Sequence, residues 1–129
     1  MFEKPEVLTL ASSLAAHAAT RQSAIARNVA NADTPGYRAQ DLPDFAESYR
    51  AEGGTALRQT RAGHISSFGG TRDLALTERA GAGTLSPNGN GVSLETEMVK
   101  AADVKREHDM ALAIYSKSLS ILRASLGRR

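Results

Sequence analysis

The stretch Asn28-Val29-Ala30-Asn31-Ala32-Asp33-Thr34-Pro35-Gly36-Tyr37-Arg38 decides the organisation of this chain. Its alanines can continue a preceding helix, whereas asparagine competes for nearby backbone groups and is favoured where a helix ends. Pro35 disfavours helical geometry at Thr34, and Gly36 can supply the positive φ that the third position of a tight turn needs. We therefore predict that a helix stops within this stretch and that a turn over residues 34–37 follows it.

Three parts are visible around this stretch. Residues 6–32 form a helical arm, the middle is rich in glycine and turn signals, and residues 93–126 form a second, longer helical arm. The sequence predicts a mainly α fold in which the long N- and C-terminal helices pair as a coiled coil. In this interpretation residues 1–33 and 92–129 form one discontinuous domain, and residues 34–91 form a flexible middle segment with short strands.

The first arm carries an apolar stripe at helical spacing. Most of its side chains are small, so a partner helix could approach closely, and Arg21 and Gln22 interrupt the stripe near its middle. The positions that we expect to lie in an assembly seam are Val7, Ala11, Leu14, Ala18, Ile25 and Val29.

The second arm has a clearer repeat. Steps of four and three residues from Leu94 trace a mostly apolar row, and a period of about 3.5 residues is typical of a coiled coil. Ser93 is the expected N-cap, and Lys105 and His108 are polar interruptions that can set register or partner choice. The expected seam positions in this arm are Leu94, Met98, Ala101, Leu112, Tyr115, Leu119, Leu122 and Leu126. The two sets together are called the predicted seam below.

The middle segment is punctuated by glycine pairs and by Asn88-Gly89-Asn90-Gly91. Asn-Gly pairs favour hairpin turns, and residues 56–57 and 64–68 are short runs that could form strands between these turn signals. We expect some β-hairpin in this region, together with considerable mobility.

The amino-acid composition argues against several classes of protein. Only 5% of the 129 residues are aromatic and none is tryptophan, so a compact core would be thin. The 16 basic and 14 acidic residues are interspersed, which argues against a nucleic-acid-binding protein. The absence of cysteine excludes disulfides and cysteine-based metal sites. No run reaches the roughly 20 apolar residues of a transmembrane helix, and no cleavable secretory signal is visible.

No catalytic, cofactor-binding or metal-binding constellation stands out in the sequence. His17, His64 and His108 are far apart and have no second ligand at metal spacing. Glu95 and Glu97 would face different ways on a helix, so they suit its first turn better than acid–base catalysis. The glycine pattern matches neither a phosphate loop nor a dinucleotide fingerprint. We therefore expect neither enzyme activity nor a cofactor.

A lone arm would be only marginally stable. Burying a large aliphatic side chain contributes about 1.5–3 kcal/mol, whereas ordering each residue costs about 1–2 kcal/mol of backbone entropy. Pairing of the arms helps, and packing against neighbouring subunits helps more. We expect the arms to be partly disordered in the free monomer and ordered on assembly.

Residues 26–37 resemble the N-terminal signature of the bacterial flagellar axial proteins, which are the rod and hook proteins. Residues 88–98, followed by a long C-terminal helix, resemble the corresponding segment of the proximal-rod members of that family. Residues 60–65 match its middle segment loosely, because Gly63 stands where a second basic residue is expected. The positions that carry the signature turn are Asn28, Asn31, Thr34, Pro35, Gly36 and Tyr37.

The resemblance implies a structural subunit of the proximal rod of the flagellar basal body. Such proteins are exported unfolded by the flagellar type III apparatus, without signal cleavage, and polymerise in the periplasm. Their terminal helices are implied to pair in a coiled-coil inner layer. The implied partners are further copies of the chain, other rod proteins, the membrane ring with the FliE adaptor, and the type III export gate.

The resemblance also implies a short Phe-x-x-x-apolar segment that docks on the export gate. Phe45 and Tyr49 have that spacing. The alternative interpretation is that they form an i,i+4 apolar pair on a short helical turn.

Two other functions stay open at this point. The related rod protein FlgC shares the N-terminal signature, and residues 88–98 are what favour the other proximal-rod member. A small helical export chaperone or regulator could bind partners through the same seam, but it would stay in the cytoplasm.

Overall fold

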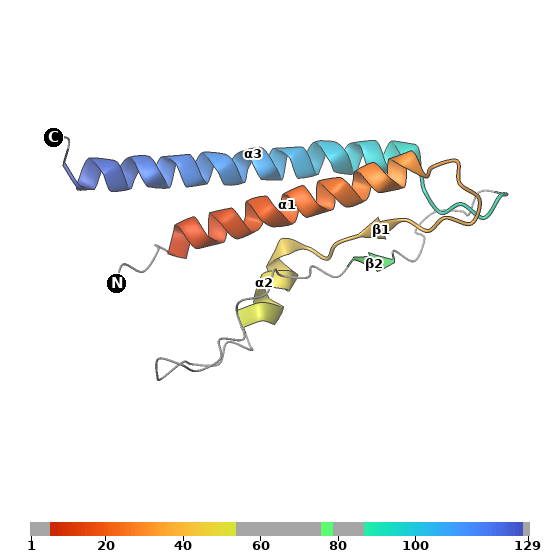
Figure 1. Ribbon diagram of the computed structural model, residues 1–129, viewed down its shortest axis with the longest axis horizontal. Coiled ribbons are helices and arrows are strands. Elements are labelled where there is room, and N and C mark those ends of the chain that lie inside the picture. Colours follow the sequence, from red (N-terminus) through yellow and green to blue (C-terminus); the bar gives the residue numbers. More distant parts are fainter. Residues whose placement is uncertain (1–5, 54–75, 79–86, 128–129) are drawn as a thin grey trace.

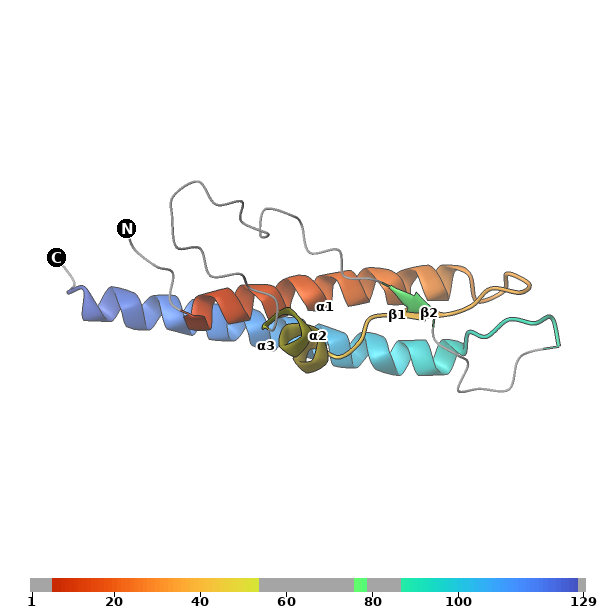
Figure 2. The ribbon, with the colours of Figure 1, turned by 90° about the horizontal axis from the view of Figure 1, so that it is seen from below.

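A computed structural model describes residues 6–53, 76–78 and 87–127. Two long helices, α1 (Glu6–Ala30) and α3 (Leu94–Ser125), lie side by side and run in opposite directions (Figure 1). The C-terminal end of α3 extends past the beginning of α1 (Figure 2). The prediction of a mainly helical chain with long terminal helices is confirmed.

The end of α1 follows the predicted chemistry. The backbone N–H of Asn31 is shared between the carbonyls of Arg27 and Asn28, both at 3.1 Å, which tightens the last turn. The N–H of Tyr37 then donates to the carbonyl of Thr34 over 3.3 Å, and Gly36 has a φ of +71°. The predicted helix stop and the predicted turn are therefore both confirmed.

The beginning of α3 is also as predicted. Ser93 is the N-cap, and its side chain accepts a hydrogen bond from the N–H of Thr96. The carboxylates of Glu95 and Glu97 lie in the first turn, where they complement the helix dipole. At the other end Gly127 has a φ of +77°, which allows the chain to leave the helix.

The core between α1 and α3 is built from small side chains. Ala18, Ile25 and Val104 form its centre, and Ala101 packs against them. Small residues let two helices approach closely, but they bury little apolar area. Among the described residues, Ile25 and Val104 are the largest apolar side chains that are fully buried. Apolar burial within the single chain is therefore modest.

The face of α3 that meets α1 differs from the predicted row. Buried positions recur every seven residues at Glu97, Val104 and Ala111, whereas Met98 and Leu112 of the predicted seam are exposed. One position along a helix turns the side chain by about 100°. The sequence pattern favoured the larger apolar side chains, but α1 presents a buried asparagine that satisfies Glu97 instead, as described below.

The segment between the long helices lies on the α1 side of the hairpin (Figure 1). It contains β1 (Gln40–Asp41), the short helix α2 (Phe45–Gly53) and β2 (Thr77–Glu78). The two strands are antiparallel, and Gln40 pairs with Glu78. The strands expected at residues 56–57 and 64–68 lie outside the described residues, as does the loose match at residues 60–65.

Candidate functional site

The signature turn is clamped by the segment that precedes α3. Asn90 is 2% exposed, and its side-chain nitrogen donates to the carbonyls of Asn31, Ala32 and Thr34 at 3.0, 2.6 and 2.8 Å. Two hydrogens are thus shared among three carbonyls of the chain that follows the end of α1. In the sequence, Asn88–Gly91 indicated a turn and residues 88–98 resembled a family segment, but neither feature predicted this contact.

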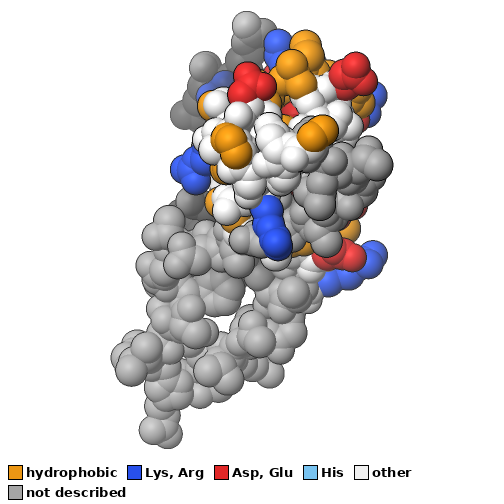
Figure 3. Space-filling view, turned by 90° about the vertical axis from the view of Figure 1, so that its right-hand side faces the viewer, with side chains coloured by type: hydrophobic (Ala, Val, Ile, Leu, Met, Phe, Trp, Pro, Cys, Tyr) orange, Lys and Arg blue, Asp and Glu red, His pale blue; other side chains and the backbone are white. Residues whose placement is uncertain are grey.

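Backbone contacts add to the hydrogen bonds of Asn90. We call the contacts of residues 88–91 with residues 31–37 the clamp. The N–H of Gly36 donates to the carbonyl of Asn88 over 3.2 Å, and the N–H of Gly91 donates to the carbonyl of Tyr37 over 3.0 Å. A Cβ built on Gly89 would lie 3.7 Å from the Cα of Gly36, so the two segments touch through their backbones. Figure 3 looks onto this end of the hairpin, where the central described atoms are mostly backbone and uncharged side chains. The clamp fixes the exit of α1 relative to the start of α3.

A second polar site lies one turn back on α1, at Asn28, which is fully buried. Its side-chain nitrogen donates to the carbonyl of Gln40 over 2.8 Å and to Glu97 Oε2 over 2.9 Å. Its side-chain oxygen accepts from the N–H of Gln40 over 3.0 Å and from the Tyr37 hydroxyl over 3.3 Å. One amide therefore joins α1, β1 and α3, and the residue predicted as a helix stop is also a tertiary link.

Four charged side chains extend this site along the hairpin. Lys100 Nζ lies 2.8 Å from Glu97 Oε1 and 3.4 Å from Asp41 Oδ2. Arg21 Nε donates to Asp41 Oδ1 over 3.0 Å. Two positive and two negative charges alternate at low exposure, so each charge has a partner. We call Arg21, Asp41, Glu97 and Lys100 the buried ion network.

The surroundings of Asp41 and Arg21 shift the pKa values of these two groups. Burial by itself would raise the pKa of Asp41, but the hydrogen bond and charge of Arg21, the charge of Lys100 and the Leu42 N–H hold that pKa below its ordinary value. Burial likewise opposes the charge of Arg21, but the hydrogen bond and charge of Asp41, together with the charges of Glu107 and Asp44, raise the pKa of the guanidinium. The ionised forms of both groups are therefore favoured in the folded chain.

The two residues with the spacing of an export segment lie on α2. The ring centroids of Phe45 and Tyr49 are 5.7 Å apart, as in an i,i+4 pair. Phe45 also meets the ring of His17 edge-on, with centroids 5.6 Å apart, and His17 Nε2 lies 3.0 Å from the carbonyl of Pro43. His17 Nδ1 has no hydrogen-bond partner among the described residues. The first turn of α2 thus packs against α1 through Phe45 and His17, while Tyr49 remains exposed.

The predicted seam divides into buried and exposed positions. In α1, the alanines at 11 and 18 and Ile25 are buried, Leu14 is half-buried, and Val7 and Val29 are exposed. In the second arm, Ala101, Leu119 and Leu122 are half-buried. The remaining positions are exposed in the single chain: Leu94, Met98, Leu112, Tyr115 and Leu126.

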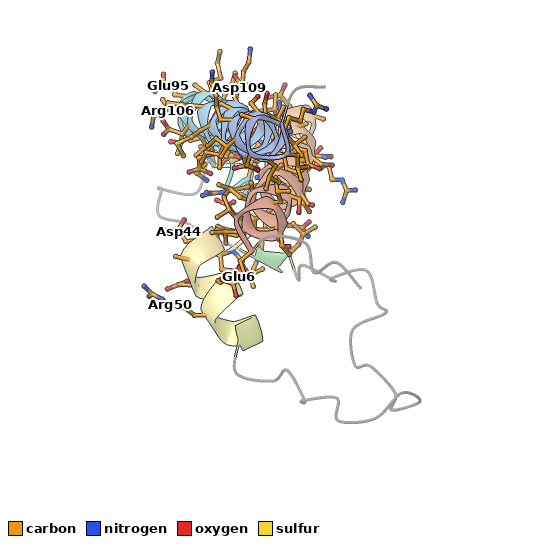
Figure 4. The ribbon with its side chains drawn as sticks, turned by 90° about the vertical axis from the view of Figure 1, so that its left-hand side faces the viewer. Glu6, Asp44, Arg50, Glu95, Arg106 and Asp109 are labelled. Carbon is orange, nitrogen blue, oxygen red and sulfur yellow. The ribbon has the colours of Figure 1, made fainter. Side chains whose placement is uncertain are left out.

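A further apolar row on α3 was missed by the sequence analysis. Val99, Met110, Ile114 and Ile121 are 40–69% exposed and lie roughly 100° around the helix from the buried row of Glu97, Val104 and Ala111. Their spacing of 11, 4 and 7 residues keeps them on one side of a helix, which is the signal that could have revealed them. We call this row the outer stripe. Next to it a polar face carries Glu95, Arg106 and Asp109, which project away from α1 (Figure 4).

The described residues contain no group of three or more potential metal ligands from histidine, cysteine, aspartate and glutamate. Within the same ranges, no helix combines the length and the apolar character that crossing a membrane requires. The polar side chains that come together in the clamp and the buried ion network are engaged with one another and bridge α1, β1 and α3.

Comparison with known proteins agrees with this architecture. Residues 8–38, which comprise most of α1 and the signature turn, match the family model described as "Flagella basal body rod protein". The chain is 32% identical over 109 residues to the flagellar basal body rod protein FlgB of Cereibacter sphaeroides, with 83% of each chain covered. It is 34% identical over 106 residues to FlgB of Escherichia coli K12, covering 76% of each, and 32% identical over 109 residues to FlgB of Salmonella typhimurium, covering 78% of each. By these similarities the chain belongs to the FlgB family of flagellar basal body rod proteins, which are structural proteins and not enzymes.

Proposed function

We propose that this chain is a structural subunit of the proximal part of the flagellar rod and that it assembles through α1 and α3. The observation that carries the proposal is the distribution of apolar side chains on α3. The outer stripe and the exposed positions of the predicted seam lie on different sides of the helix. A helix that is apolar on several sides is typical of one that is surrounded by other elements.

The balance of burial supports the same conclusion. Ile25 and Val104 are fully buried, whereas Ile121, Val99 and Met98 are each more than 60% exposed. Each large side chain that becomes buried at a subunit contact contributes about 1.5–3 kcal/mol, which is comparable to its contribution within a core. Contacts between subunits would therefore stabilise α3 more than its contacts with α1 do.

We propose the following assembly on this basis. Residues 1–33 and 92–129 act as one domain whose helices form coiled-coil contacts, both within the chain and with neighbouring copies and other rod proteins. Residues 34–91 form an appended segment. The free chain is partly disordered, crosses the inner membrane through the type III export apparatus without signal cleavage, and folds as it joins the rod in the periplasm, next to the membrane ring and its FliE adaptor.

A pair of neighbouring substitutions tests this proposal. Ile114→Asp places a charge in the outer stripe, whereas Ala113→Asp places the same charge at an exposed position on the polar side of the helix. If the outer stripe is an assembly contact, I114D abolishes motility and its product is missing from purified basal bodies, while A113D retains both. Equal steady-state amounts of the two variants in the cell exclude a loss of expression as the cause.

The contact can also be mapped directly, because the chain has no cysteine. Met110→Cys introduces a single thiol in the outer stripe, and Ser120→Cys introduces one at an exposed position on the polar side. In intact basal bodies the thiol of M110C is expected to be protected from a maleimide reagent that labels S120C, and the two thiols are expected to react alike once the basal bodies are dissociated. If the chain is absent from basal bodies and is found only in the cytoplasm, the seam serves a chaperone or a regulator and the proposal is wrong.

A further inference from the structure

The clamp contains two copies of the same dipeptide in different surroundings. Asn88-Gly89 and Asn90-Gly91 are adjacent in the sequence, and each asparagine is followed by a residue without a Cβ. In such a pair the backbone nitrogen of the glycine can reach the side-chain carbonyl carbon of the asparagine with little steric hindrance. The two pairs are therefore equivalent in an unfolded chain, and any difference between them in reactivity comes from the fold.

At Asn90-Gly91 both reacting groups are held. The side-chain nitrogen of Asn90, which would leave, donates to three carbonyls, and its side-chain oxygen accepts from the N–H of Val92 over 2.7 Å. The N–H of Gly91, whose nitrogen would attack, donates to the carbonyl of Tyr37. Attack would require the hydrogen bonds of the leaving nitrogen and of the Gly91 N–H to break, at a side chain that is 2% exposed.

At Asn88-Gly89 the corresponding groups are open. Asn88 is exposed, and neither its side-chain nitrogen nor the N–H of Gly89 has a hydrogen bond to any described residue. The side-chain oxygen of Asn88 accepts from the N–H of Asn90 over 3.1 Å, just as that of Asn90 accepts from the N–H of Val92, so this bond does not distinguish the two positions. Gly89 has a φ of +77°, which glycine adopts without steric strain.

We propose that Asn88 is a site of spontaneous deamidation in the folded chain and that the clamp protects Asn90 from the same reaction. The nitrogen of Gly89 attacks Cγ of Asn88, a C–N bond forms, the bond from Cγ to the side-chain nitrogen breaks, and ammonia leaves with the proton of the attacking amide. The resulting succinimide adds one water and opens to aspartate or isoaspartate. No oxidant, reductant or enzyme is needed.

The product alters the clamp at a defined point. The Asn88 carbonyl accepts from the N–H of Gly36 in the intact chain. In the isoaspartyl product this carbonyl becomes a free carboxylate, and the main chain runs through the former side chain with one additional methylene. The reaction therefore adds a negative charge and lengthens the connection that leads into α3.

The experiment uses the full-length chain and compares the two positions within one molecule. The chain is incubated in mildly alkaline buffer, with and without denaturant, and the tryptic peptide of residues 80–100 is mapped over time by tandem mass spectrometry. In native buffer Asn88 is expected to react about tenfold faster than Asn90 or more, which is the ratio given by an opening free energy of about 1.4 kcal/mol or more for the clamp. In denaturant the ratio is expected to fall towards one.

Each alternative result has a definite meaning. Equal rates at the two positions in native buffer would overturn the proposal, as would an Asn88 that reacts only in denaturant. Gly89→Ala is expected to slow the reaction at Asn88, and Gly91→Ala, the matched control, is expected to leave it unchanged. Because Gly89→Ala strains a positive φ, both variants are also measured in denaturant, where an unchanged rate at Asn88 in G89A would rule out attack by the residue 89 nitrogen.

Discussion

The side chains of Asn28 in α1 and Glu97 in α3 are hydrogen bonded over 2.9 Å, and both are buried. This bond crosses the hairpin at a point where an apolar pair would normally be expected. The same asparagine amide also satisfies the N–H and the carbonyl of Gln40, so the position of β1 depends on it. A buried network that is fully satisfied favours one arrangement of the elements, because any other leaves polar groups without partners.

Removing this amide should destabilise the chain strongly. Asn28→Ala leaves Glu97 and the backbone groups of Gln40 without their partner, and we expect a loss of about 2–4 kcal/mol in the free energy of unfolding. Asn31→Ala is the matched control, because the Asn31 side chain makes only local bonds to Arg27 and Thr34 and should cost about 1 kcal/mol or less. Urea unfolding of the two variants measures the difference. Equal losses would show that Asn28 acts only as a helix-ending residue.

The substitution of asparagine by aspartate can be compared at two positions of the clamp, 90 and 88. Asn90→Asp keeps the shape of the side chain but replaces the donor with a carboxylate that faces three carbonyls. We expect it to cost about 3 kcal/mol and to accelerate hydrogen exchange at the end of α1. Asn88→Asp is exposed and retains its acceptor, so its effect should stay within about 0.5 kcal/mol. Comparable protection from exchange in the two variants would contradict the role given to Asn90.

Gly36 allows a test of conformation without steric crowding. A Cβ at this position would have no atom within 4 Å, so a substitution acts through its φ of +71° alone. We expect Gly36→Ala to cost about 1–2 kcal/mol and Gly36→Val to cost more, because left-handed geometry disfavours a Cβ and especially a branched one. Gly36→Asn should cost less than Gly36→Ala, since asparagine tolerates this region. If the order of asparagine and alanine is reversed in thermal unfolding, the turn does not require positive φ.

The buried ion network predicts a specific response to acid. The pKa of Asp41 lies below its ordinary value in the folded chain, so its carboxylate contributes stability above the ordinary value of about 3.9, and this contribution is lost as the pH falls through the folded-state pKa. We expect Asp41→Asn to cost about 1–3 kcal/mol at neutral pH and to reduce the further loss of stability below about pH 4. Asp103→Asn is the control, because the exposed pair of Asp103 and Arg106 should contribute less than about 1 kcal/mol.

The features that the sequence predicted correctly are those decided by local chemistry. Pro35 and Gly36 locate the end of α1 and the turn, and Ser93 locates the start of α3, because each residue restricts its own backbone or caps its neighbours. The packing between the helices was harder to predict. A heptad pattern identifies rows of apolar residues but not which row meets the partner, and here the row with Glu97 and Val104 does so.

The long-range polar contacts could not be read from the sequence. Asn90 caps α1 from 56 to 59 residues away, and Asn28 reaches Glu97 across 69 residues. Neither contact leaves a periodic signal, because a single polar residue on a helix looks the same whether it faces solvent or a buried partner. The resemblance of residues 26–37 and 88–98 to one family pointed to both segments without explaining them, and the structure shows that they are in contact.

The packing of Phe45 against His17 allows a test of the export segment. Phe45→Ala removes a side chain that is expected to dock on the export gate, and it also removes the ring contact with His17 that packs α2 against α1. His17→Ala removes only this ring contact and leaves the segment with Phe45 and Tyr49 intact. If Phe45 is read by the gate, F45A should lower the amount of chain exported from the cytoplasm while H17A leaves it unchanged, because recognition concerns the unfolded segment. If the pair is only structural, both variants should lower the thermal stability of the folded chain equally and should be exported normally.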